Sequence, residues 1–263
     1  MDIGGNGVES LHRAGIIASV IPGLDKDYML LDLGANVVPK DDTPFTLEFW
    51  TTLHEMVAWS HIFCFTTSGQ AGLMANFCTS GANSNTSINC MEKNVNSATG
   101  TSPVGQEFHY SVVVVPDGVN GATVTAYLKN AVTGATIGKS TLYYADWNVE
   151  RLNLQRCWLG TSGYPNWNDP DSNASYNEVR VWNRALSEDE LTHSAKMGPE
   201  ALIPFELDDG THVQCDTSAA TATDALTHRW SFNGDFVDSA GGLSATKVGN
   251  PTFINNQLHV PSG

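Results

Sequence analysis

The stretch YNEVRVWNRALSEDEL, from Tyr176 to Leu191, gives the clearest indication of the architecture of this chain. Its first half is rich in β-branched and aromatic residues and predicts a strand. Its second half predicts a short helix, because Ser187 is a favoured N-cap and Glu190, three residues later, forms a capping box. Gly198 and Pro199 then end the helix. We therefore expect a strand followed directly by one capped helix.

On both sides of this stretch the sequence predicts further short strands. In FTLEFWTTL, Phe45, Leu47 and Phe49 alternate with polar residues, which indicates one apolar face. The clearest strand is FHYSVVVVPDG, at residues 108–118, which ends at a Pro-Asp-Gly turn. Similar runs occupy residues 28–34, 60–69, 70–80, 121–130, 131–142 and 152–161. Short strands separated by turns predict an all-β sandwich or barrel.

The composition argues against two classes of partner. The chain has 263 residues, of which 16 % are charged, and a formal net charge of −15. Such an acidic surface repels phosphate backbones, so we expect no nucleic-acid partner. No run of 18 apolar residues is present, so we expect no membrane span. If Met1 is the initiator, the start of the chain lacks an ordinary secretion signal, whereas a processed chain would have lost one.

The chain has five cysteines, an odd number. Cys78 and Cys90 flank a loop rich in Asn and Ser, and we predict a disulfide between them. Cys64 and Cys157 lie in strand-like runs and form either two buried thiols or a second bridge. The odd count leaves at least one cysteine unpaired or bonded to another molecule.

The run EVRVWNRALS followed by a short helix resembles the end of laminin-G-like domains of the concanavalin A-like superfamily. FTLEFWTTL is similar to a strand in the first half of those domains, and FHYSVVVV to their central strand, with Phe108 in place of the usual Trp. The resemblance covers about residues 28–197. It implies an all-β, concanavalin A-like jelly-roll β-sandwich with one short helix.

The end of the chain resembles the beginning of the same kind of domain. HRWSFNGD, DSAGG and QLHVPSG, within residues 228–263, are similar to the family's opening strands. The order is therefore permuted relative to the family. We predict an N-terminal extension at 1–27, a laminin-G-like body at 28–197 and a linker at 198–227. The opening strands at 228–263 then complete the same or a neighbouring body.

The C-terminal segment carries large apolar side chains that need cover. Burying each one stabilises the folded state by roughly 1.5–3 kcal/mol. The segment either folds back on its own body, inserts into the next subunit, or is the start of a second domain cut short. We predict insertion into the next subunit, which would give a head-to-tail ring or filament. The assembly residues would be Trp230, Phe232, Phe236, Phe253 and Leu258.

Motifs for catalysis are missing from the sequence. A retaining glycosidase needs two carboxyl groups about 5–5.5 Å apart, which an E-x-D-x-x-E strand would provide. The nearest run has Glu206 and Asp208, but Thr211 stands where another Glu is needed. Neither H-E-x-x-H nor G-x-S-x-G occurs, and no cysteine pair has C-x-x-C spacing. We predict that the protein is not an enzyme.

One polar loop is a candidate calcium site. Asp169, Asp171 and Asn173 have the D-x-D-x-N spacing that begins a calcium loop. The sixth position is Ala174 instead of Gly, and the twelfth is Arg180 instead of Glu, so this is not an EF-hand. The family resemblance favours calcium, because relatives bind it through loop carboxylates. The alternative is a plain Asp/Asn turn.

Beside that loop, Tyr164 and Trp167 are candidate sugar-binding residues if their rings are exposed for stacking, and packing at the sandwich edge is the alternative. Together these features predict a non-enzymatic extracellular or cell-surface protein. Its partners would be other copies of itself, assembled head to tail by strand complementation. The alternative is a monomeric, lectin-like adhesion module that binds surface glycans with calcium as cofactor.

Overall fold

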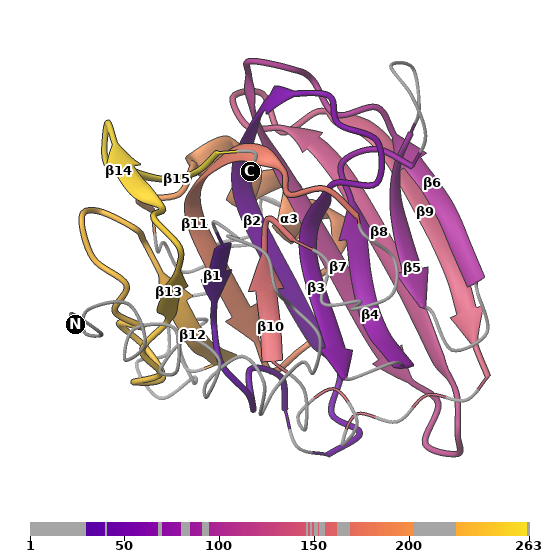
Figure 1. The fold of residues 1–263 in the computed structure, drawn as a ribbon. Helices are drawn as coiled ribbons and strands as arrows, with labels where there is room; N and C mark the ends of the chain where they lie inside the picture. The colour runs from indigo at the N-terminus through magenta and orange to yellow at the C-terminus, as the bar shows by residue number, and fades with distance from the viewer. Residues whose placement is uncertain are drawn as a thin grey trace, which may run out of the picture.

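The computed structural model describes residues 30–39, 41–67, 70–79, 85–90, 95–145, 147, 149, 152, 156–161, 169–201 and 225–261. These residues form two antiparallel sheets packed face to face, with the first sheet in front in Figure 1. The predicted concanavalin A-like jelly-roll sandwich is confirmed. No helix in the described part of the chain is long and apolar enough to cross a membrane.

The first sheet has the strand order β13-β1-β10-β3-β4-β5-β6. Its strands are β13 (Thr246–Val248), β1 (Leu30–Asp32), β10 (Arg156–Leu159), β3 (His61–Thr67), β4 (Gln70–Asn76), β5 (Thr86–Cys90) and β6 (Val95–Gly100). The second sheet has the order β14-β15-β11-β2-β7-β8-β9, and β12 also pairs with β11. Its strands are β14 (Thr252–Ile254), β15 (Gln257–Val260), β11 (Asn173–Trp182), β2 (Phe45–Glu55), β7 (Glu107–Pro116), β8 (Ala122–Asn130), β9 (Thr136–Tyr144) and β12 (Leu226–Trp230).

The main core lies between the two sheets and follows the alternation expected for β2. Phe45, Leu47 and Phe49 are buried in this core, and the rings of Phe49 and Phe63 stack with their centroids 4.9 Å apart. The opposite face of β2 is buried as well, so both faces of this central strand are covered. A strand covered on both faces can bury polar groups only where they find partners.

The described residues contain one helix, α3 (Glu188–Met197), which follows β11 as predicted. The capping box is confirmed: the Ser187 hydroxyl accepts a hydrogen bond from the backbone N–H of Glu190, and the Glu190 carboxylate accepts one from the backbone N–H of Ser187. The helix packs on β7 and β8, on the outer side of the second sheet. A second apolar cluster fills this contact, formed by Val113, Tyr127, Trp182, Leu186 and Leu191.

At one side of the sandwich the edge strands β6 and β9 come together. A Cβ atom added to Gly138 would lie 1.7 Å from the carbonyl oxygen of Thr99, so only glycine fits this contact. The hydroxyls of Thr99 and Ser140 lie 3.0 Å apart across it. The close approach shields these two edges from other strands.

The C-terminal strands complete the other side of the sandwich, and residues 225–261 are called the tail below. β12 and β15 pair with β11, and β13 pairs with β1 (Figure 1). Of the arrangements that the sequence left open, this structure contains the intramolecular one, in which the tail folds onto its own body. The structure contains one chain, so insertion into a neighbouring subunit stays a prediction.

Candidate functional site

The tail contacts β1 and β11, and these contacts are called the tail seam below. On β11 the seam consists of two antiparallel ladders. Ala174 lies opposite Val260 near the start of β11, and Val179 lies opposite Trp230 near its end. Trp230, Phe232 and Leu258 have no exposed surface and belong to the main core. Phe236 and Phe253 are partly buried against it, with ring centroids 4.9 Å apart. The tail therefore supplies part of the core of the sandwich.

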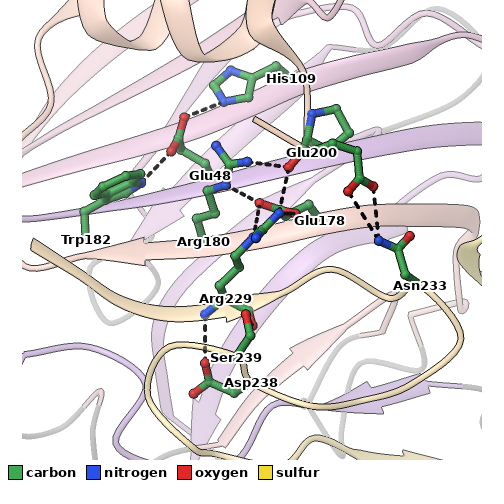
Figure 2. A network of polar contacts seen from close by, with 11 residues as sticks. Glu48, His109, Glu178, Arg180, Trp182, Glu200, Arg229, Asn233, Asp238 and Ser239 are labelled. Atoms are coloured by element: carbon green, nitrogen blue, oxygen red, sulfur yellow. Dashed lines mark hydrogen bonds and ion pairs between the residues drawn. The ribbon is translucent and has the colours of Figure 1, made fainter. Parts of the chain in front are cut away.

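An ion pair joins tail and body in the middle of this seam (Figure 2). Arg229 of β12 donates two hydrogen bonds of 2.9 Å to Glu178 of β11. Arg180 also donates to Glu178, and its guanidinium lies 4.5 Å from the ring centroid of Trp50. The carbonyl oxygen of Pro199 accepts hydrogen bonds from both arginines. Burial raises the pKa of Glu178, although the two arginines act in the opposite direction.

A second buried carboxylate lies beside this pair. Glu48 of β2 lies 2.9 Å from His109 Nε2 and accepts a hydrogen bond from the indole of Trp182 (Figure 2). Burial acts to raise the pKa of Glu48, but His109 and the charge of Arg180 hold it below its usual value. Both Glu48 and His109 have no exposed surface. The Glu48 carboxylate is therefore held by His109 and Trp182 and buried away from solvent, whereas His109 Nδ1 has no hydrogen-bond partner among the described residues.

The turn after β12 is organised by Asp238, which the D-S-A-G-G motif places there. Its carboxylate lies 2.7 Å from His228 Nδ1 and accepts hydrogen bonds from the backbone N–H groups of Arg229, Gly241 and Leu243, among others. Burial acts to raise the pKa of Asp238, but these contacts lower it to about 2. All of these hydrogen bonds of the Asp238 carboxylate are therefore made within the tail.

Two histidines lie close together near the start of β11, where β15 pairs with it. His54 Nε2 of β2 lies 2.7 Å from the hydroxyl of Ser175 on β11, and His259 Nδ1 of β15 lies 3.3 Å from the same hydroxyl. The two rings lie 5.2 Å apart at their centroids. Burial and the neighbouring His54 lower the pKa of His259. Close by, Glu107 accepts hydrogen bonds from Asn177 of β11 and Gln257 of β15.

On the first sheet, a row of chemically varied side chains crosses the strands. The strand register places Asp32, Trp158, Cys64, Met74 and Asn89 in line, on the face that points away from the core. Each of them is at most 6 % exposed. Such a combination of carboxylate, indole and amide can bind hydroxyl groups, but its burial keeps solvent-borne ligands away from it in this state.

One end of the first sheet presents an exposed aromatic ring next to buried polar groups. Trp59, just before β3, is 49 % exposed and has a φ of 65°, and its backbone N–H donates to the carbonyl of Cys78. Two residues on, both ring nitrogens of His61 lack a hydrogen-bond partner among the described residues, as does the amide nitrogen of Asn76. His61 and Asn76 lie opposite each other in the ladder, and Asp169 Oδ2 is 4.0 Å from His61 Nε2. Burial lowers the pKa of His61 to about 3.

The predicted calcium residues have different surroundings. Asp171 is buried and accepts a 2.6 Å hydrogen bond from the Thr161 hydroxyl, and Asn173 begins β11 opposite Glu55. Among the described residues no three His, Cys, Asp or Glu side chains are grouped closely enough to hold a metal ion. Calcium binding therefore stays a prediction.

Two other sets of predicted residues fall partly or wholly outside the described part of the chain. The candidate sugar-binding residues Tyr164 and Trp167 lie in residues 162–168, which the structure does not describe. Cys78 is buried, but the side chain of Cys90 is not described, so the disulfide between them stays a prediction. Cys157 is a buried thiol, one of the two alternatives expected for it.

Sequence reasoning missed the ion pair of the seam and the histidine pair. The sequence gives no clear signal for the first, because Glu178 and Arg229 lie among other polar residues in the strands NASYNEVRVW and LTHRW. No sequence signal pairs His54 with His259, because their proximity depends on β11 separating β2 from β15 in the sheet.

With the fold and the candidate site described, the chain can be compared with known protein families. A model of the laminin-G-like family of the concanavalin A-like lectin/glucanase superfamily matches residues 25–192. The chain belongs to this family. The match ends within α3, so the tail that completes the sandwich lies beyond it. A search of curated protein sequences finds no significant match.

Solved structures resemble this family member in fold alone. Domain 4 of the extracellular arabinanase AbnA from Geobacillus stearothermophilus, bound to arabinotriose, is 15 % identical, with a TM-score of 0.44 over 62 % of this chain and 71 % of that one. A provisionally assigned carbohydrate-binding protein from Bacteroides ovatus is 14 % identical, with a TM-score of 0.45 over 88 % and 63 %. Tailspike protein 2 of an Escherichia coli O157:H7 bacteriophage is 11 % identical, with a TM-score of 0.41 over 65 % and 23 %.

Proposed function

We propose that the protein is a non-enzymatic, extracellular adhesion module that binds carbohydrate and whose tail completes its own sandwich. Membership of a lectin and glucanase superfamily supports this class of ligand. The observation that carries the proposal is the end of the first sheet, where Trp59 is half exposed beside His61 and Asn76. His61 and Asn76 are themselves buried, so the Trp59 ring is the surface that this end offers to a ligand.

The backbone at Trp59 supports a role in binding. A φ of 65° is unfavourable for a large side chain, and such conformations gather at functional sites. Since the ring is 49 % exposed, its burial offsets little of this cost. Aromatic rings bind the apolar faces of ligands, while a few polar groups around them fix the orientation. A sugar ring offers one apolar face, which fits the exposed ring of Trp59.

The non-enzymatic part of the proposal rests on the state of the buried acids. Glu48 is held by His109 and Trp182, and Glu178 by two arginines, so neither is directed at solvent. A retaining glycosidase requires two carboxyl groups that both reach the substrate. Incubation with any oligosaccharide that the protein binds will leave that sugar intact, as followed by chromatography, and release of shorter products would contradict the proposal.

A glycan array of the intact chain tests the main proposal, with Trp59→Ala as the decisive variant and Tyr143→Ala as its control. Tyr143 is 57 % exposed on β9, the edge strand of the second sheet, and its loss removes a comparable ring elsewhere. We expect loss of about 1–3 kcal/mol of binding free energy in the first variant, as for stacking on an aromatic ring. Equal binding by both variants, or no binding by the intact chain, would overturn the proposal.

Two further arms of this array test the predictions that stand outside the described site. A variant with Tyr164 and Trp167 both replaced by Ala tests whether these two residues add stacking surface. Binding with and without a calcium chelator tests the prediction for Asp169, Asp171 and Asn173. Sugar binding that survives chelation would remove calcium from the proposal and leave the aromatic site intact.

A second candidate function is assembly, in which the tail completes the body of a neighbouring copy. One observation favours it: the body and the tail are joined through residues 202–224, and they contact each other through β ladders and side-chain pairs that two separate chains can form equally well. Exchange of an identical element between copies is a known route to oligomers. Repeated in one direction, it would produce a ring or a filament.

Two samples separate these arrangements. Electron microscopy and sedimentation of the intact chain will show compact monomers if the tail folds back, and rings or filaments if it is exchanged. A chain ending at residue 224, mixed with a separate peptide of residues 225–261, shows whether the seam can form between molecules. Assembly by the intact chain that persists without the tail would refute strand complementation.

A further inference from the structure

The body and the tail each place one imidazole over the same hydroxyl group. His54 Nε2 and His259 Nδ1 lie 2.7 and 3.3 Å from the Oγ atom of Ser175. In the sheet β11 lies between β2 and β15 (Figure 1), so the two histidines reach Ser175 from opposite sides. Their nitrogens therefore converge on one point at the seam.

The residues around this convergence point differ in their exposure to solvent. His54 is exposed and His259 is partly exposed, whereas Ser175 is buried beneath them. A single hydroxyl has one proton, so it can donate a hydrogen bond to only one of the two rings and must accept from the other. A divalent ion has no such restriction, because it can accept a lone pair from both neutral imidazoles.

The distances fit the replacement of the hydroxyl oxygen by an ion. Bonds between zinc and imidazole nitrogen measure about 2.0–2.1 Å, so the nitrogen of His54, at 2.7 Å, needs to move by about 0.6–0.7 Å toward the point now held by Ser175 Oγ, and that of His259, at 3.3 Å, by about 1.2–1.3 Å. Rotation of the Ser175 side chain can clear that point or leave its oxygen as a further ligand. Imidazole suits zinc and copper, whereas calcium takes oxygen ligands.

We propose that His54 and His259, together with Ser175 and solvent, bind one divalent transition-metal ion, zinc or copper, which fastens the tail to the body. This inference goes beyond the proposed function, because it concerns neither the sugar site nor the predicted calcium loop. The ion adds a link between β2 and β15, which have no ladder with each other. Metal binding thus strengthens the seam at the end away from the Arg229–Glu178 pair.

Calorimetric titration of the intact chain, without a polyhistidine tag, with zinc chloride tests the site. We expect one ion per chain, and at least about tenfold weaker binding for each of His54→Gln and His259→Gln, since each removes one of two imidazole ligands. The matched control is His193→Gln in α3, which leaves the pair intact. Ser175→Ala separates the roles further, since both rings remain and binding is expected to persist.

Copper provides a structural readout of the same site. Electron paramagnetic resonance of the chain with one equivalent of Cu²⁺ will show coupling to two imidazole nitrogens, and to one in either single variant. Hydrogen exchange of the β15 amides will slow on zinc addition in the wild type and not in His54→Gln. Because His54 is exposed, this variant is expected to fold, which circular dichroism verifies. Zinc binding of equal strength in the doubly substituted chain, an unchanged copper spectrum in His54→Gln, or unaltered β15 exchange would overturn the proposal.

Discussion

Replacing Arg229 by Met tests how strongly charge holds the tail to the body. Arg229 donates two hydrogen bonds of 2.9 Å to Glu178, whose side chain has no exposed surface. Methionine keeps much of the length and apolar character, so the change removes mainly the ion pair. Breaking a buried pair costs about 3–5 kcal/mol when the other charge is left alone. Because Arg180 still contacts Glu178, we expect a loss near the lower end, about 3 kcal/mol.

Urea unfolding of the intact chain measures this loss as a shift of the midpoint at an unchanged slope. A double-mutant cycle with Glu178→Gln isolates the pair. We expect the two substitutions together to cost about 2 kcal/mol less than their sum, because each alone leaves a buried group without its partner. Faster hydrogen exchange of the β12 amides in Arg229→Met would locate the effect at the seam.

The control is Arg184→Met. This change removes a partly exposed ion pair, in which a guanidinium nitrogen of Arg184 lies 2.7 Å from the Glu190 carboxylate. Pairs open to solvent contribute about 0.2–1 kcal/mol, so this variant is expected to lose far less stability. If Arg229→Met costs no more than Arg184→Met, or if the cycle shows no coupling, burial does not make this pair strong and the reasoning fails.

Three further predictions concern acid sensitivity, packing and thiol reactivity. Burial acts to raise the pKa of Asp238, but its hydrogen bonds lower it to about 2. About 2 kcal/mol of stability is therefore present above pH 4 and lost as the pH falls toward 2, and Asp238→Asn should lack this component. Unfolding curves from pH 2 to 6 measure it, and a constant difference between the two proteins would contradict it. Gly138→Ala should lower stability by about 1–3 kcal/mol, because the new Cβ would lie 1.7 Å from the Thr99 oxygen. An unchanged melting temperature would show that β6 and β9 do not approach this closely. Burial raises the pKa of the Cys157 thiol well above its usual value, so an aromatic disulfide reagent should label it only on unfolding. Mass spectrometry of the labelled native protein tests this, and prompt labelling of Cys157 would refute it.

β2 and the helix were accessible from sequence because their signals are local, whereas β5 and β6, in a stretch rich in Asn and Ser, were not predicted as strands. Alternation of Phe45, Leu47 and Phe49 with polar residues identifies β2, and the Ser187–Glu190 box identifies the start of α3. The resemblance of residues 228–263 to opening strands also indicated that the tail carries core residues, and Trp230 is fully buried. Each of these inferences depends on residues that are near one another along the chain.

The partners of the charged and polar side chains were not accessible in this way. Glu178 meets Arg229, and His54 meets His259, only because β11 accepts the tail strands on one side and β2 on the other. A ladder shifted by one residue would turn every side chain of the tail strands to the opposite face, and no local pattern specifies that register between distant strands. The family and its sandwich thus follow from short-range order in the chain. The tail seam and its two pairs, Glu178–Arg229 and His54–His259, in contrast, form only when the strands of both sheets have assembled. Strands that are far apart in the sequence pair stably only when the core between the sheets is buried.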